Sequence, residues 1–99
     1  MAYSFILRQE AVKEFTEAYV WYEEQQEGLG DQFRNEFQEK LELICNNPFH
    51  YKKPYKRFHE ALTHRFPFLI VYTVEEKVNQ IVVIAIFHTS RNPKKKFRK

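Results

Sequence analysis

The spacing of hydrophobic positions changes along the chain and divides it into elements. Residues 3–8 show a short period-two pattern, which predicts a strand. From about Gln9 the apolar residues recur at helical spacing, and this predicts an amphipathic helix that ends before Gly28. A second helical stripe follows, with Asp31 as its expected N-cap, and it ends at the sequence NNP at 46–48. Two helices joined by a tight glycine-containing turn predict a helical hairpin.

The second half of the chain is dominated by strand patterns. Residues 57–64 predict one strand, and residues 65–74 and 80–88 are rich in β-branched and aromatic side chains, as in an antiparallel hairpin. The last of these segments is apolar on both faces, which is expected of a central strand. Pro67 cannot donate a ladder hydrogen bond and indicates an edge position or a bulge early in its strand. The predicted fold is α+β in the order β-α-α-β-β-β, a mostly antiparallel sheet packed against an N-terminal helical hairpin.

The composition is that of a globular chain. The sequence has 99 residues, of which 43% are hydrophobic and 29% charged, and we interpret residues 1–99 as one domain. The single cysteine, Cys45, excludes an internal disulfide and argues against a zinc site. His50, His59 and His64 lack metal-ligand spacing, so we expect no metal and no cofactor. The N-terminus has no signal-peptide pattern and no apolar run is long enough for a membrane span, which predicts a cytoplasmic protein with no membrane partner.

Charge is divided unevenly between the two halves of the chain. Residues 1–50 contain four Lys or Arg against ten Asp or Glu, whereas residues 51–99 contain twelve against three. A polyanion would approach only the second half; the alternative is that these charges only solvate the surface. The cations of the candidate nucleic-acid surface are Lys52, Lys53, Lys56, Arg57, Lys94, Lys95 and Lys96. The aromatic residues available for base stacking beside them are Phe49, Tyr51 and Tyr55.

Four sequence features occur in a specific order: WYEEQQEGLGDQF in the first helix and turn, NNP after the second helix, RFPFLIVY, and a last strand ending IAIFHTSRNP. In this order and spacing they resemble the RelE/ParE superfamily of bacterial type II toxins, and the likeness covers nearly the whole chain. The resemblance implies a growth-inhibiting toxin of a toxin-antitoxin or plasmid-stabilisation system in the bacterial cytoplasm. It also implies a cognate antitoxin that neutralises the toxin, with contact to operator DNA only through the antitoxin complex.

The resemblance allows two kinds of target. RelE-like members cut mRNA, commonly on the ribosome, and would make this chain a metal-independent endoribonuclease; ParE-like members inhibit DNA gyrase. We favour mRNA, because the basic charge is concentrated where the RNA-cleaving members bind RNA. The alternatives are a non-enzymatic gyrase inhibitor, or a degenerate member that binds only its antitoxin or operator DNA.

The same resemblance implies a site at the end of the final strand. Attack by a 2′-hydroxyl needs a proton acceptor and cations around the phosphate, roles that suit His88, Arg65 and Arg91. We expect His88 to continue an apolar row to the point where the strand leaves the core. The residues expected to share this face are Val82, Ile84, Ile86 and His88.

Simpler interpretations of the candidate residues are also open. His88 would otherwise only cap its strand with a hydrogen bond, and Arg65 would pair with Glu60 or with the acidic helices. Glu60 itself is expected to be an exposed strand carboxylate rather than a general base. Trp21 lies off the main apolar stripe of the first helix, so we predict that it is partly exposed and contacts the antitoxin.

Overall fold

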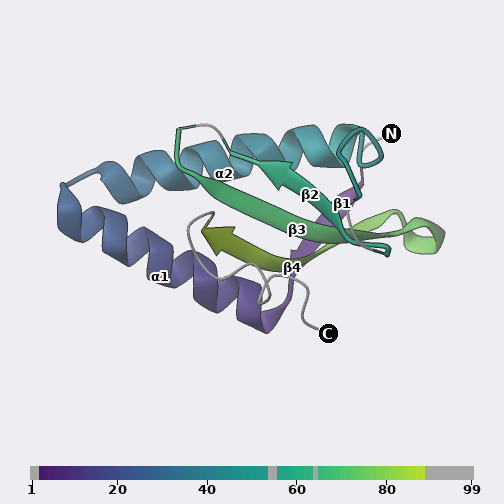
Figure 1. Ribbon diagram of the computed structural model, residues 1–99, viewed down its shortest axis with the longest axis horizontal. Helices are drawn as coiled ribbons and strands as arrows, with labels where there is room; N and C mark the ends of the chain where they lie inside the picture. The colour runs from purple at the N-terminus through teal and green to yellow at the C-terminus, as the bar shows by residue number, and fades with distance from the viewer. Residues whose placement is uncertain (1–2, 54–55, 64, 89–99) are drawn as a thin grey trace.

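The computed structural model describes residues 3–53, 56–63 and 65–88, and it confirms the predicted order of elements (Figure 1). The elements are β1 (Ser4–Leu7), α1 (Gln9–Gln25), α2 (Leu29–Asn46), β2 (His59–Leu62), β3 (Phe68–Glu75), the 3-10 helix η1 (Glu76–Val78) and β4 (Gln80–His88). β2 is shorter than the expected segment 57–64. It begins only at His59, and after Leu62 the Thr63 N–H donates to the Phe68 carbonyl over 2.8 Å as the chain turns toward β3. Pro67 lies directly before β3 rather than within it.

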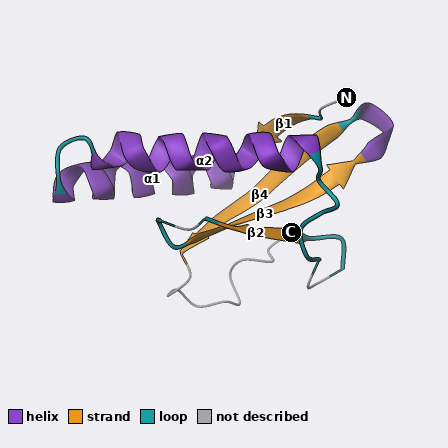
Figure 2. Ribbon diagram, turned by 90° about the horizontal axis from the view of Figure 1, so that it is seen from above, coloured by secondary structure: helices purple, strands orange, loops and turns teal. Residues whose placement is uncertain are grey.

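The four strands form one mixed sheet in the order β1-β4-β3-β2. β1 runs parallel to β4, whereas β3 runs antiparallel to both β4 and β2. β4 is therefore an interior strand, as its apolar sequence predicted. Both helices lie on the same face of this sheet (Figure 2), so the mostly antiparallel sheet with a packed helical hairpin is confirmed.

Aromatic packing attaches the helical hairpin to the sheet. Phe33 of α2 is 1% exposed. Its ring centroid lies 5.4 Å from that of Phe15 and 5.3 Å from that of Tyr22, both on α1. It also lies 5.1 Å from the ring of Phe68, the first residue of β3. Burial of each such side chain contributes roughly 1.5–3 kcal/mol, so this cluster joins all three elements and fixes where β3 begins.

A β-bulge interrupts the pairing of β3 with β4. Val71 pairs with Ala85 and Tyr72 pairs with Val83, and Ile84 between them has no partner in the β3 register. One extra residue in a strand shifts its side-chain alternation by one position and increases its local twist. The two halves of β4 therefore present their odd-numbered residues to opposite faces of the sheet.

This bulge makes one sequence prediction wrong. Ile86 packs in the core beneath the helices, whereas Val82 and Ile84 belong to a second apolar cluster that includes Val71. The expected single row of Val82, Ile84, Ile86 and His88 does not exist. A count of every second residue from Val82 fails because it crosses the bulge at Ile84.

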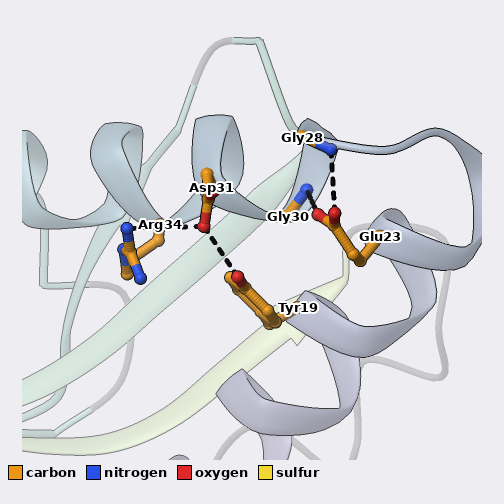
Figure 3. A network of polar contacts seen from close by, with 6 residues as sticks. All are labelled: Tyr19, Glu23, Gly28, Gly30, Asp31 and Arg34. Atoms are coloured by element: carbon orange, nitrogen blue, oxygen red, sulfur yellow. Dashed lines mark hydrogen bonds and ion pairs between the residues drawn. The ribbon is translucent and has the colours of Figure 1, made fainter.

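A carboxylate from α1 organises the tip of the helical hairpin (Figure 3). Glu23 accepts hydrogen bonds from the backbone N–H groups of Gly28 (2.8 Å) and Gly30 (2.9 Å). Gly28 has φ 87° and is the N-cap of α2, so the expectation that Asp31 caps this helix is wrong. A Cβ on Gly30 would lie 2.8 Å from the Tyr19 carbonyl oxygen, so the close approach of the helices requires glycine there.

Asp31 has a different function at the same tip. The Tyr19 hydroxyl donates to the Asp31 carboxylate over 2.6 Å, and this bond raises the pKa of Tyr19. The Arg34 guanidinium lies 3.4 Å from the same carboxylate and 5.9 Å from the centroid of the Tyr19 ring. Asp31 therefore links α1 to α2 through its side chain instead of capping the backbone.

We expect Glu23→Ala to lower the free energy of unfolding by about 2 kcal/mol, because two backbone donors at the start of α2 lose a charged acceptor. The control is Glu24→Ala, an exposed neighbour, for which the change should stay within about 0.5 kcal/mol. Urea unfolding followed by far-UV circular dichroism measures both. Equal midpoints for the two variants would contradict this account of the hairpin tip.

Candidate functional site

Two of the predicted site residues come from neighbouring strand ends. Phe68 at the start of β3 pairs with His88 at the end of β4, and Arg65 lies three residues before Phe68. The backbones that bear Arg65 and His88 therefore meet at one end of the sheet. The side chain of His88 lies outside what the structure describes. So do Arg91 and the tail cations Lys94, Lys95 and Lys96, whose assignment to the site stays a prediction.

The turn that bears Arg65 is anchored from two directions. The Arg65 N–H donates to the Glu36 carboxylate of α2 over 2.9 Å. Thr63, 2% exposed, donates its hydroxyl to the Phe66 carbonyl and accepts the N–H of Phe68 over 3.1 Å. The Arg65 side chain is exposed, with its guanidinium 5.6 Å from the ring centroid of Phe66. The fixed backbone of the turn thus presents an exposed cation at the sheet end, where the guanidinium can bind an anion.

Arg65 contacts an acidic helix through its backbone, whereas the simpler interpretation of the sequence expected pairing with Glu60 or with the acidic helices. Glu36 binds the backbone N–H of Arg65 and fixes the turn. Glu60 of β2 is 5% exposed, so the expectation of an exposed strand carboxylate is wrong. β2 pairs on one side with β3, and on its other side the Glu60 N–H donates to the Lys52 carbonyl over 2.9 Å. The segment around Lys52 packs on that outer edge and covers Glu60, which an edge strand would otherwise expose.

The candidate nucleic-acid residues lie in the connection between α2 and β2. Lys52, Lys53, Lys56 and Arg57 are all exposed. The bond from the Glu60 N–H to the Lys52 carbonyl places the start of this basic segment along the outer edge of β2. This bond puts Lys52 beside the start of β2, and the strand runs on from there to the turn of Arg65, so Lys52 and Arg65 lie at different points along one side of the sheet. Such an arrangement suits the backbone of a single-stranded polyanion.

A buried polar group holds this connection against the sheet, and sequence reasoning missed it. The His59 ring stacks on that of Tyr72, with centroids 5.0 Å apart and planes 12° from parallel. The Tyr72 hydroxyl donates to the Pro48 carbonyl over 2.6 Å, and burial raises the pKa of Tyr72, so the hydroxyl keeps its proton. His59 Nδ1 lies 3.1 Å from the Tyr51 carbonyl and donates to it in the Nδ1-protonated tautomer. No local motif marks these contacts, which join positions far apart in sequence.

The predicted antitoxin contact, Trp21, lies on α1. Trp21 is 55% exposed, and its ring meets that of Tyr22 edge-on with centroids 5.1 Å apart. Val20 beside it is 47% exposed. The expected partial exposure of Trp21 is confirmed, and its contact with an antitoxin stays a prediction.

Within residues 3–53, 56–63 and 65–88, no three His, Cys, Asp or Glu side chains are arranged to hold a metal ion. Among these residues there is also no helix with the length and apolar character of a membrane span.

Comparison with known proteins identifies relatives in sequence and in fold. A family described as the ParE toxin of type II toxin-antitoxin system, parDE, matches residues 5–93. Comparison with curated proteins finds no match.

Among solved structures, the toxin-antitoxin complex RelBE of E. coli contains a chain 18% identical, with a TM-score of 0.68, over 91% of this chain and 100% of that one. Isolated RelE toxin of E. coli is 19% identical, with a TM-score of 0.69 and coverage of 94% and 90%. A chain of the complex RelBE2 from Mycobacterium tuberculosis is 10% identical, with a TM-score of 0.64 and coverage of 89% and 99%. These likenesses confirm the fold.

We expect Thr63→Val to lower the free energy of unfolding by about 1–3 kcal/mol, because buried backbone groups in the Arg65 turn lose their hydroxyl partner. Thr16→Val is the matched control, since the Thr16 hydroxyl bonds the Val12 carbonyl on an exposed helix face. Its cost should stay within about 0.5 kcal/mol. If urea unfolding gives the two variants the same stability, the hydroxyl of Thr63 does not hold the turn.

Proposed function

The chain belongs to the family of ParE toxins of type II toxin-antitoxin systems, and on that premise we propose that it arrests growth by cleaving mRNA without a metal ion. Its partner is a cognate antitoxin, and its proposed substrate is single-stranded mRNA, bound free or on the ribosome. The fold is shared with the RelE toxin of E. coli, which supports the assignment to the superfamily but not the choice of target.

One observation carries the proposal: the Phe68–His88 pair brings the turn of Arg65 and the end of β4 to the same end of the sheet. The exposed cations Lys52 and Lys53 lie farther along the same side of the sheet, where the Lys52 carbonyl accepts the Glu60 N–H at the outer edge of β2. A phosphate held at the sheet end would therefore meet Arg65 directly, while its flanking backbone meets the lysines. Positive charge would then lie beside the phosphate that reacts and beside the phosphates that flank it.

The chemistry that suits these residues is transfer to a neighbouring hydroxyl. The 2′-oxygen attacks the adjacent phosphorus, the bond to the 5′-oxygen breaks, and a 2′,3′-cyclic phosphate and a 5′-hydroxyl result. In our proposal His88 accepts the proton of the 2′-hydroxyl as the bond forms, and the departing 5′-oxygen takes a proton from solvent water. Arg65 and Arg91 bind the non-bridging oxygens and stabilise their developing charge.

Inhibition of DNA gyrase is the second candidate, and the description of the matching family as ParE toxin favours it. In that case the same sheet end is a protein-binding surface, and His88 and Arg91 act structurally. The two candidates differ in the first cellular process to stop. Induction should halt incorporation of labelled amino acids within minutes if mRNA is the target, and should cause gyrase-linked DNA breaks first if gyrase is.

Growth arrest on induction should depend on the residues of the sheet end. We expect His88→Gln to weaken arrest strongly, because loss of a general base costs about 10²- to 10⁴-fold in rate. We expect Arg65→Ala to weaken it too, because a lost charged hydrogen bond costs roughly 1.5–3 kcal/mol, or about tenfold or more in rate. The control is Arg8→Ala, which removes an exposed arginine before α1 and should arrest growth like the parent chain. Soluble yield and co-purification with the antitoxin verify that the variants fold. Full toxicity of a stable His88→Gln, Arg65→Ala double variant would overturn the catalytic proposal.

Antitoxin binding should be visible in tryptophan fluorescence, because Trp21 is the one tryptophan of the sequence. Its 55% exposure leaves room for a blue shift when a partner removes water from the indole. Titration with a tryptophan-free antitoxin measures this shift, and Trp21→Leu should weaken the complex. An unchanged emission maximum at saturation would show that the antitoxin binds elsewhere.

A further inference from the structure

Besides the surface around Trp21, a second exposed aromatic surface lies away from the sheet end. It is formed where α2 ends and the basic connection to β2 begins. Phe49 is 53% exposed and Leu43 is 55% exposed. Beside them is a hollow of ≈ 410 Å³, lined by Leu43, Asn46, Asn47, His50 and Tyr51. We call this surface the α2–β2 corner and define it by these five residues and Phe49. Exposed apolar side chains beside a hollow that also contains polar side chains indicate a binding surface.

Positive charge surrounds the aromatic rings of the α2–β2 corner. Lys40 Nζ lies 5.5 Å from the ring centroid of Tyr51. The exposed Lys52 and Lys53 follow Tyr51 directly in the chain. Of the nearby acids on α2, Glu42 lines the neighbouring hollow beside β1 and not this one. Aromatic rings interleaved with cations match the bases and phosphates of single-stranded nucleic acid better than an apolar protein partner.

The α2–β2 corner is held in position before any ligand binds. Phe49 makes edge-to-face contacts with Tyr3 (6.5 Å) and His59 (6.0 Å). The bond from the Tyr72 hydroxyl to the Pro48 carbonyl fixes the backbone next to Phe49. A stacking surface that is already ordered loses little conformational entropy when a base binds.

The distance between the α2–β2 corner and the sheet end suits one continuous strand of RNA. Glu36, which binds the Arg65 backbone, and Asn46 at the corner are ten residues apart on α2, so about 15 Å separates them along the helix axis. Figure 1 shows the end of α2 and the end of β4 at opposite ends of the sheet. The Lys52 carbonyl accepts the Glu60 N–H at the outer edge of β2, near the start of that strand, and the exposed Lys53 follows Lys52 in the chain. A strand of a few nucleotides would span this path.

We propose that the α2–β2 corner binds an unpaired base of single-stranded RNA a few nucleotides from the cleaved phosphate. The inference rests on the proposed cleavage of mRNA and adds to it a second point of contact with the substrate. Phe49 and His50 stack the base, and Lys52 and Lys53 bind the phosphates that lead to Arg65. The corner thereby sets how much unpaired RNA the toxin needs.

The test measures binding of uncleavable RNA to the full chain released from its antitoxin. The probes are fluorescent 2′-O-methyl oligoribonucleotides of about three and about eight nucleotides, followed by anisotropy. Phe49→Leu should weaken binding of the longer probe about 5- to 20-fold and leave the shorter one unchanged, because only the longer probe reaches the corner. Lys52→Gln with Lys53→Gln should reduce the slope of log K against log salt by about 1.4 for the longer probe. Val12→Ala, an exposed apolar change on α1, is the control and should bind both probes like the parent chain.

The outcomes separate this inference from the proposed function. If Phe49→Leu binds the longer probe like the parent chain, the corner proposal is overturned, while binding of the shorter probe by the parent still supports mRNA as substrate. If Phe49→Leu weakens only the antitoxin complex, the corner is a protein interface and the proposal is also overturned. If the parent chain binds neither probe at micromolar concentration, both proposals fail together.

Discussion

The pairing of β3 with β4 is the interaction on which the rest of this structure depends. It runs from Glu75 and Gln80 beside the short helix η1 to Phe68 and His88 at the other end. Because both strands are interior, their side chains fill the core on the helix side and a second cluster on the other face. The same register decides which functional groups meet, since it places the turn of Arg65 next to the end of β4. Fold and candidate site thus share one set of backbone hydrogen bonds.

The helical hairpin contributes to the site from a distance. Phe33 packs against Phe68 and so fixes the start of β3, and Glu36 on the same helix binds the Arg65 backbone. The acidic first half of the chain therefore supports a basic surface built by the second half. In our proposal an antitoxin contacts the exposed face of α1 around Trp21, while nucleic acid approaches the cations at the sheet edge. The two partners need not compete for the same side chains.

Periodic patterns predicted the element order, the hairpin and the interior position of β4, because these follow from which residues are apolar at fixed spacing. The errors have a common physical cause in contacts between distant residues. The N-cap of α2 is Gly28, and Glu23 on the previous helix accepts the backbone N–H groups at this helix start, so a search for a local side-chain cap chose Asp31. Glu60 is buried because chain from the α2–β2 connection packs on the outer edge of β2. Ile84 lies in a bulge that no single-strand pattern reveals, and the stacking of His59 on Tyr72 is likewise invisible in either segment alone.

The central claim, cleavage of mRNA at the sheet end, is tested most directly by mapping RNA 5′ ends in cells shortly after the toxin is induced. The account predicts new 5′-hydroxyl ends inside reading frames, formed by the parent chain and at least about tenfold fewer when Arg65 is replaced by alanine. If the parent chain produces these ends and the variant produces far fewer at equal protein yield, the toxin acts on RNA. Intact transcripts during growth arrest, accompanied by DNA breaks that require gyrase, would contradict the claim and identify gyrase as the target.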